Sequence, residues 1–88
     1  MERTVTIAIE EGLHARPAAL FVAAAQAAPA KVTISKGDAP VPADSILSIM
    51  TLGAKAGDTV TLTTEGDSAD DAAALDSLEN FLLQTEVS

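Results

Sequence analysis

Three short segments of the chain, residues 4–9, 31–35 and 59–64, alternate between hydrophobic and polar residues. An alternation of period two is typical of a β-strand that buries one face. The pattern therefore predicts three strands. The side chains expected to point inward from the first and last of them are Val5, Ile7, Ile9, Val60 and Leu62.

A fourth extended segment is less regular. Residues 39–42 contain Pro40 and Pro42, and each proline removes one N–H donor from a sheet ladder. We therefore expect this segment to form an edge strand or an extended loop.

Apolar residues recur at helical spacing over residues 17–28, 45–52 and 68–85. These segments predict three helices. The residues expected on their apolar faces are Pro17, Phe21, Ala24, Ala25 and Ala28 in the first, Ile46, Ile49 and Met50 in the second, and Ala72, Leu75, Leu78 and Leu82 in the third, with Phe81 at its margin.

The ends of the helices carry their own signals. Asp44 or Ser45 is expected to cap the second helix, and Gly53 to end it. Ser68 and Asp71 resemble a capping box at the start of the third helix, with Asp71 in place of the usual Glu or Gln.

The predicted order of elements is βαββαβα, without a repeated β–α–β unit. This order favours an α+β fold in which helices cover one face of an antiparallel or mixed sheet, an open two-layer sandwich. With 88 residues, the chain is expected to form a single domain over residues 1–88 with one modest core.

Composition excludes several classes of function. The chain has no cysteine and one histidine, which excludes disulfides, a cysteine nucleophile and metal sites built from several imidazoles. Thirteen acidic residues against five basic ones give a net charge of −8, which disfavours nucleic acid and anionic membranes as partners. The sequence also lacks a signal-peptide pattern and any apolar run of about 20 residues, so we expect a soluble cytoplasmic protein.

The segment Gly12-Leu-His-Ala-Arg-Pro-Ala18 carries the most informative chemistry. His14 lies between a strand and a helix start, where the positive end of the helix disfavours imidazolium and favours a neutral, nucleophilic ring. Arg16 has a guanidinium that can bind phosphate oxygens, as can free N–H groups of a first helical turn. These parts suit a site that accepts a phosphoryl group. The alternative from the residues alone is a histidine cap beside a solvated arginine.

The same segment resembles the active-site signature of HPr, the histidine-containing phosphocarrier family of the bacterial phosphoenolpyruvate-dependent sugar phosphotransferase system. A second segment, Ala43-Asp-Ser-Ile-Leu-Ser-Ile-Met-Thr-Leu-Gly53, resembles the regulatory-serine region of that family in type and spacing. The resemblance covers essentially the whole chain, including the order of its elements.

The resemblance implies a four-stranded antiparallel sheet with three helices on one face and the third strand at an edge. It implies that enzyme I phosphorylates His14 on Nδ1, that Arg16 binds the phosphate, and that enzyme IIA domains receive the phosphoryl group. It further implies a monomeric carrier rather than a stand-alone enzyme, with no metal and no cofactor of its own.

Ser45 has two interpretations. A serine at a helix start is by default an N-cap. Some members of the family are phosphorylated on the matching serine by a dedicated serine kinase, and Ser45 is therefore a candidate regulatory site. Asp44 stands where the family commonly has lysine.

A docking surface for partner proteins is expected beside His14. Its candidate residues are apolar: Ala19, Phe21, Ile46, Leu47 and Met50. The alternative for Ile46 and Met50 is a place in the core. Family members often carry basic residues on the first two helices, and Ala23, Gln26 and Ser48 occupy those positions here.

Two other functions remain open at this point. The chain could serve a related phosphorelay, such as a nitrogen-regulatory or dihydroxyacetone-kinase branch, with the same His14 chemistry. It could also be a docking regulator that is never phosphorylated, although such regulators in the family have lost the histidine that this chain retains.

Overall fold

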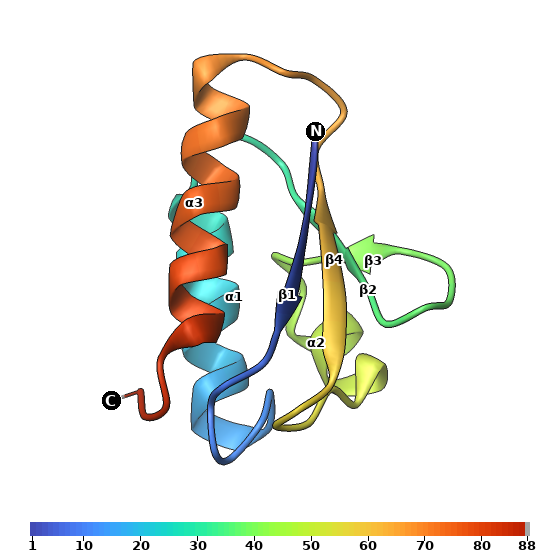
Figure 1. Ribbon diagram of the computed structural model, residues 1–88, viewed down its shortest axis with the longest axis vertical. Helices are drawn as coiled ribbons and strands as arrows, with labels where there is room; N and C mark the ends of the chain where they lie inside the picture. Colours follow the sequence, from blue (N-terminus) through green and yellow to red (C-terminus); the bar gives the residue numbers. More distant parts are fainter. Residues whose placement is uncertain (88) are drawn as a thin grey trace.

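The computed structural model describes residues 1–87 and places three helices against one four-stranded sheet (Figure 1). In chain order the elements are β1 (Glu2–Thr6), α1 (Ala15–Ala27), β2 (Thr33–Ser35), β3 (Val41–Pro42), α2 (Ile46–Leu52), β4 (Thr59–Thr63) and α3 (Ala69–Leu83). The strands lie in the order β1-β4-β2-β3, and every neighbouring pair is antiparallel. The predicted α+β open-faced sandwich is confirmed, including the position of the proline-containing β3 at an edge.

The two faces of the sheet differ because side chains alternate along each strand. On the covered face, Val5 pairs with Val60 and Ile34 pairs with Leu62, and all four are buried. The opposite face carries small polar side chains, among them Thr4, Thr6, Thr33, Ser35, Thr59, Thr61 and Thr63. The hydrophobic core therefore lies between the sheet and the helices.

Helices α1 and α3 close the core through an edge-to-face pair. The rings of Phe21 and Phe81 have centroids 5.5 Å apart and are inclined by 66°. Phe21 is fully buried, whereas Phe81 is half-buried, as expected for a residue at the margin of its stripe. At the far edge, Arg3 of β1 joins α3 by ion pairs to Asp76 and Glu79.

The residues predicted to lie on the apolar faces of α1 and α3 are partly wrong, because the buried faces are rotated about the helix axes relative to the prediction. On α1 the residues buried are Pro17, Ala18, Phe21, Val22 and Ala25, while the predicted Ala24 and Ala28 are only half-buried. On α3 the structure buries Ala74 with the three leucines and leaves Ala72 half-buried. Alanines on either side of a stripe look alike to a periodicity argument, so only the contacts of the folded chain decide between them.

The first strand is shorter than the alternation indicates. Pairing with β4 ends at Thr6, although Ile7 and Ile9 remain buried. Beyond Thr6 the N–H groups of Ala8 and Glu10 bond to the carbonyls of Leu82 and Thr85 near the end of α3. The alternation thus continues because this extended segment packs on a helix end instead of a strand.

Both predicted N-caps are present. The Ser45 Oγ accepts a hydrogen bond from the Ser48 N–H at the start of α2, and Gly53 ends that helix in the left-handed conformation. Ser68 and Asp71 form a reciprocal capping box at the start of α3. The hydroxyl and backbone N–H of Ser68 hold the pKa of the Asp71 carboxyl below its ordinary value.

The loop between α2 and β4 packs against the loop between β1 and α1 at one end of the sheet, the lower end in Figure 1. The Leu13 N–H donates to the Ala54 carbonyl at 2.9 Å, and the Gly57 N–H donates to the Ile7 carbonyl at 2.8 Å. Gly12 has a positive φ of 72° at this contact, and a Cβ built there would lie 2.9 Å from the Lys55 Cα. Only glycine allows the two backbones to approach this closely.

This close contact leads to a prediction for Gly12→Ala, with Gly37→Ala as the matched control. Both glycines have positive φ, but nothing lies within 4 Å of a Cβ on Gly37. The left-handed conformation costs roughly 1–2 kcal/mol for alanine at either position. Gly12→Ala adds a collision with backbone atoms, so we expect at least twice the loss of unfolding free energy seen for Gly37→Ala. Equal losses in urea denaturation would contradict the contact.

Candidate functional site

His14 occupies the N-cap position of α1 and is exposed to solvent. Its backbone is extended, with φ −125° and ψ 157°, and its side chain makes no capping hydrogen bond. The ring Cδ2 lies 3.2 Å from the place that a Cβ on Gly12 would occupy. In imidazole, Nδ1 is on the ring edge opposite Cδ2, so the packing against Gly12 leaves the Nδ1 edge on the other side.

The first turn of α1 presents free hydrogen-bond donors beside this ring. The first intrahelical bond runs from the Ala18 N–H to the His14 carbonyl, at 3.3 Å, and Pro17 has no N–H. The N–H groups of Ala15 and Arg16 therefore have no backbone acceptor in the part of the chain that the structure describes. The turn also contains no acidic residue that would neutralise the positive end of the helix.

Ala15 has a φ of +46°, and it is the one described residue other than glycine with positive φ. The left-handed region costs an alanine roughly 1–2 kcal/mol. The strained residue lies directly between His14 and Arg16, the two predicted site residues. Such strain is concentrated at functional sites, because the surrounding structure must hold it in place.

Arg16 is exposed on the first turn of α1, two residues from His14. Among residues 1–87, no carboxylate lies within ion-pair distance of its guanidinium. A free guanidinium offers five N–H donors in a planar fork that matches phosphate oxygens. His14, Arg16 and the open N–H groups thus lie on one short, exposed stretch of chain.

Helix α2 adds an exposed apolar surface. Ile46, Leu47 and Met50 are 45%, 76% and 51% exposed, whereas Ile49 is fully buried and anchors the helix. The alternative placement of Ile46 and Met50 in the core is therefore wrong. Helix α2 also packs against α1, which brings this surface to the helix that begins at His14.

The two docking candidates on α1 have different outcomes. Ala19 is exposed, but Phe21 is fully buried against Phe81 and has no surface for a partner. The prediction for Phe21 as a docking residue is wrong. An aromatic ring in an alanine-rich helix of a chain with only two aromatic residues is needed to fill the core.

Ser45 is half-buried and acts as the N-cap of α2. Beside it, the Asp44 carboxylate forms an ion pair of 2.8 Å with Lys31, and this hydrogen bond holds the pKa of the Asp44 carboxyl below its ordinary value. The Gln26 side chain donates to the Asp44 carbonyl at 3.3 Å. These contacts tie the start of α2 to the last turn of α1 and to the segment that follows it.

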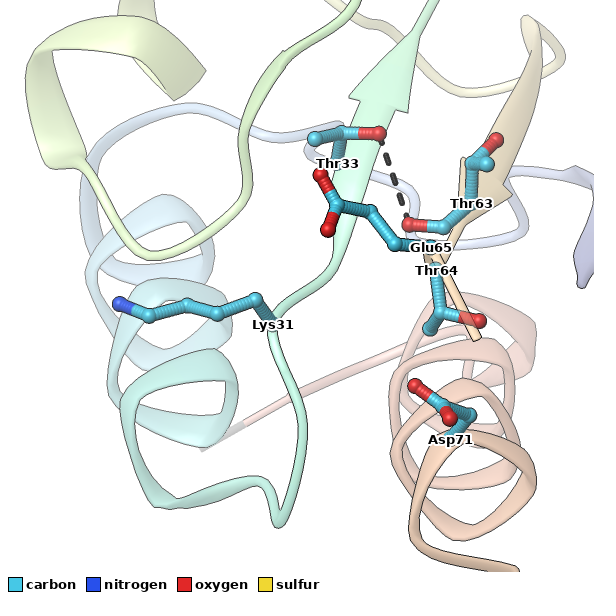
Figure 2. Close-up of a pocket in the computed structure, with 6 residues that line it drawn as sticks. All are labelled: Lys31, Thr33, Thr63, Thr64, Glu65 and Asp71. Atoms are coloured by element: carbon cyan, nitrogen blue, oxygen red, sulfur yellow. Dashed lines mark hydrogen bonds between the residues drawn. The ribbon is translucent and has the colours of Figure 1, made fainter. Parts of the chain in front are cut away.

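The described residues offer little for other kinds of site. A depression of about 400 Å³ lies at the opposite end of the sheet from His14, lined by Lys31, Thr33, Thr63, Thr64, Glu65 and Asp71 (Figure 2). Two of these, Thr33 and Thr63, are joined across the strands by a hydrogen bond. No group of acidic or histidine side chains within residues 1–87 is arranged to hold a metal ion. Over the same residues, no helix has the length and apolar character that a membrane span requires.

Comparison with known proteins agrees with the site. Residues 1–84 match the family model described as the PTS HPr component phosphorylation site. Two phosphocarrier proteins HPr are close relatives. The one from Haloferax volcanii is 47% identical, with 98% of this chain and 97% of the relative covered, and the one from Streptomyces coelicolor is 43% identical, with 94% and 88% covered.

The fold agrees as well. The crystal structure of a phosphocarrier protein HPr from Bacillus anthracis superimposes with a TM-score of 0.86 at 39% identity, and the match covers 93% of this chain and 95% of the other. A family model that matches nearly the whole chain, two close relatives and one shared fold give the same assignment. The chain belongs to the HPr family of phosphocarrier proteins.

Proposed function

We propose that this protein carries phosphoryl groups in a phosphotransferase system, with His14 as the residue that is phosphorylated. The observation that supports this most is the position of the chain's one histidine, exposed at the N-terminal end of α1 beside free N–H groups and an unpaired Arg16. Phosphorylated enzyme I is the proposed donor, and enzyme IIA domains are the proposed acceptors.

The chemistry requires a neutral imidazole. The lone pair of Nδ1 attacks the phosphorus atom of the donor's phosphoryl group, and an N–P bond forms while the bond between phosphorus and the donor atom breaks. The electron pair of the broken bond stays on the donor atom. In onward transfer an acceptor atom attacks the same phosphorus and the Nδ1–P bond breaks, so the carrier ends as it began.

The first turn of α1 and Arg16 suit the charge of the transferred group. A phosphoryl group brings roughly two negative charges to a chain that already carries −8 and has Glu10 and Glu11 on the same loop. The N–H groups of Ala15 and Arg16 and the Arg16 guanidinium offset that charge through charge-assisted hydrogen bonds. We assign Arg16 the role of phosphate binding.

Ile46, Leu47 and Met50, with Ala19, form the proposed docking surface for the donor and the acceptors. Removing exposed apolar side chains from water stabilises a complex even when long-range charge attraction is weak. This matters here because Ala23 and Gln26 are exposed and uncharged on α1. Carrier and partners are proposed to meet in the cytoplasm, with the carrier as a monomer.

Ser45 remains a candidate for phosphorylation by a serine kinase. A phosphate there would replace the cap on the Ser48 N–H and would lie next to the Asp44 carboxylate. It would also place negative charge beside the exposed apolar residues of α2, which would weaken docking. The N-cap role is the one that its hydrogen bond supports.

A phosphorylation assay tests the role of His14. Incubation with phosphoenolpyruvate and the enzyme I of the same organism should add one phosphate that is labile to acid and stable to alkali. His14→Ala, at an exposed position, should remain folded by circular dichroism and accept none. A phosphate with histidine-type lability on His14→Ala would overturn the assignment, because the chain contains no second histidine.

A comparison of transfer rates tests the role of Arg16. Loss of a charge-assisted contact to the transferred phosphate costs about 1.5–3 kcal/mol, so Arg16→Ala should slow transfer roughly ten- to a hundredfold. The exposed side chain should change the unfolding free energy by no more than about 0.5 kcal/mol. Arg16→Lys should recover part of the rate, since lysine keeps the charge but lacks the planar fork. Unchanged transfer in Arg16→Ala would remove this residue from the site.

A further inference from the structure

Some of the basic residues of this acidic chain form ion pairs and others do not. Three of the five lie within ion-pair distance of carboxylates: Arg3 with Asp76 and Glu79, Lys31 with Asp44, and Lys36 with Asp58. The remaining two, Arg16 and Lys55, have no such partner among residues 1–87. Thirteen carboxylate side chains compete for five cations, so two unpaired cations are a feature that needs an explanation.

Both residues without an ion-pair partner among residues 1–87 have their backbone near His14, although they come from distant parts of the sequence. Arg16 follows His14 by two residues, whereas Lys55 belongs to the loop between α2 and β4. The place that a Cβ on Gly12 would occupy is 2.9 Å from the Lys55 Cα and 3.2 Å from the His14 Cδ2. The backbone of Lys55 and the ring of His14 are therefore close neighbours across Gly12.

The local structure fixes the backbone at Lys55. The Asp58 N–H donates to the Lys55 carbonyl at 3.0 Å, closing a turn in which Gly57 has a φ of +90°. The Asp58 carboxylate in turn accepts from the Lys55 N–H at 2.9 Å. That backbone hydrogen bond is the main reason why the pKa of the Asp58 carboxyl is lowered. The turn is held from both ends next to His14.

Unlike its backbone, the side chain of Lys55 is not held in place by any ion pair within residues 1–87. It is exposed, and the Asp58 carboxylate next to it is already engaged with the Lys36 ammonium at 3.4 Å and with the backbone. The other charged groups on the adjoining loop are Glu10 and Glu11, both exposed. A lysine side chain combines a compact charge with a flexible four-carbon stem, so its ammonium can move to a new anion nearby.

We propose that Lys55 is a second phosphate-binding residue: its backbone lies on the Cδ2 side of the His14 ring, and its flexible stem carries the ammonium past the ring to the phosphoryl oxygens on Nδ1. The inference rests on the proposed phosphocarrier function and extends it. Lys55 exchanges no atom or proton in the transfer. It offsets the negative charge that moves onto His14, which two acidic residues on the same loop and a net charge of −8 would otherwise disfavour.

The test uses three variants of the full chain. Lys55→Gln removes the charge, Lys55→Arg keeps it, and Lys31→Gln is the control, since it makes the same change of net charge at an exposed lysine that follows the other end of α1. The phosphorylated proteins are made with phosphoramidate, a chemical donor, and their ³¹P resonances are titrated with pH. Rates of phosphorylation by enzyme I are measured separately, at about 0.1 M and about 1 M salt.

A nearby cation favours the dianionic form of the phosphoryl group. We therefore expect the ³¹P resonance of Lys55→Gln to titrate roughly half a pH unit higher than that of the wild type. The rate of phosphorylation should fall roughly three- to tenfold at low salt, as for the loss of one partly exposed charged contact. The difference should shrink at about 1 M salt, where the Debye length is about 3 Å. Lys55→Arg should retain most of both properties.

The role of Lys55 would be overturned if Lys55→Gln and Lys31→Gln gave the same ³¹P titration and the same rate of phosphorylation. Lys55→Gln that transfers slowly but titrates like the wild type would overturn it too, because the charge would then act on a partner and not on the phosphoryl group. A wild-type protein that takes no phosphate from either donor would overturn the phosphocarrier function and this inference together. If the wild type is phosphorylated normally, a negative result for Lys55→Gln contradicts the role of Lys55 and leaves the phosphocarrier function intact.

Discussion

The hydrogen bond from the Leu13 N–H to the Ala54 carbonyl joins two loops on which the rest of the site depends. One loop enters α1 and carries His14, and the other leaves α2 and carries Lys55. The loops can touch because Gly12 has no Cβ at the point of contact. Leu13 anchors the contact in the core, where it is fully buried, while His14 immediately after it stays exposed. Burial of one residue thus holds its neighbour at the surface.

The distribution of charged residues relates this contact to the proposed function. Most basic side chains of the chain stabilise the fold by pairing with carboxylates, as Arg3 does between β1 and α3. The two without a partner among residues 1–87, Arg16 and Lys55, both lie near His14 and the loop contact. The apolar residues exposed on α2, of which Leu47 is the most exposed, form the proposed docking surface. In the proposed function, charged groups act on the phosphoryl group and hydrophobic burial holds the partner.

The sequence predicted the elements well where local signals are strong. The βαββαβα order, the edge position of β3, the caps at Ser45 and Ser68 and the place of His14 at the start of a helix all followed from alternation, prolines and capping residues. Phosphate binding by Arg16 was expected from the chemistry of a guanidinium beside a helix start and from the resemblance to a family. Hydrophobic periodicity predicted the buried residues of a helix less well where alanine is frequent, since alanine fits both the core and the surface.

Three features lay beyond local patterns because they arise from contacts between distant segments. Nothing around Lys55 in the sequence marks it as a neighbour of His14, since the approach depends on packing across Gly12. The positive φ of Ala15 has no signal either, because an alanine reveals no preference for that conformation. For Phe21, periodicity favoured the core and the resemblance favoured docking, and its packing on Phe81, 60 positions later, decides for the core.

We expect the loop contact to present one particular nitrogen of His14 to the phosphoryl donor. Packing of the Cδ2 edge against Gly12 leaves the opposite ring edge, which carries Nδ1, for the phosphoryl group. Long-range ¹H–¹⁵N correlation spectra of the phosphorylated protein identify the substituted nitrogen directly. We expect a phosphoryl group on Nδ1 alone; a phosphoryl group on Nε2 would show that the packing against Gly12 does not select the ring nitrogen.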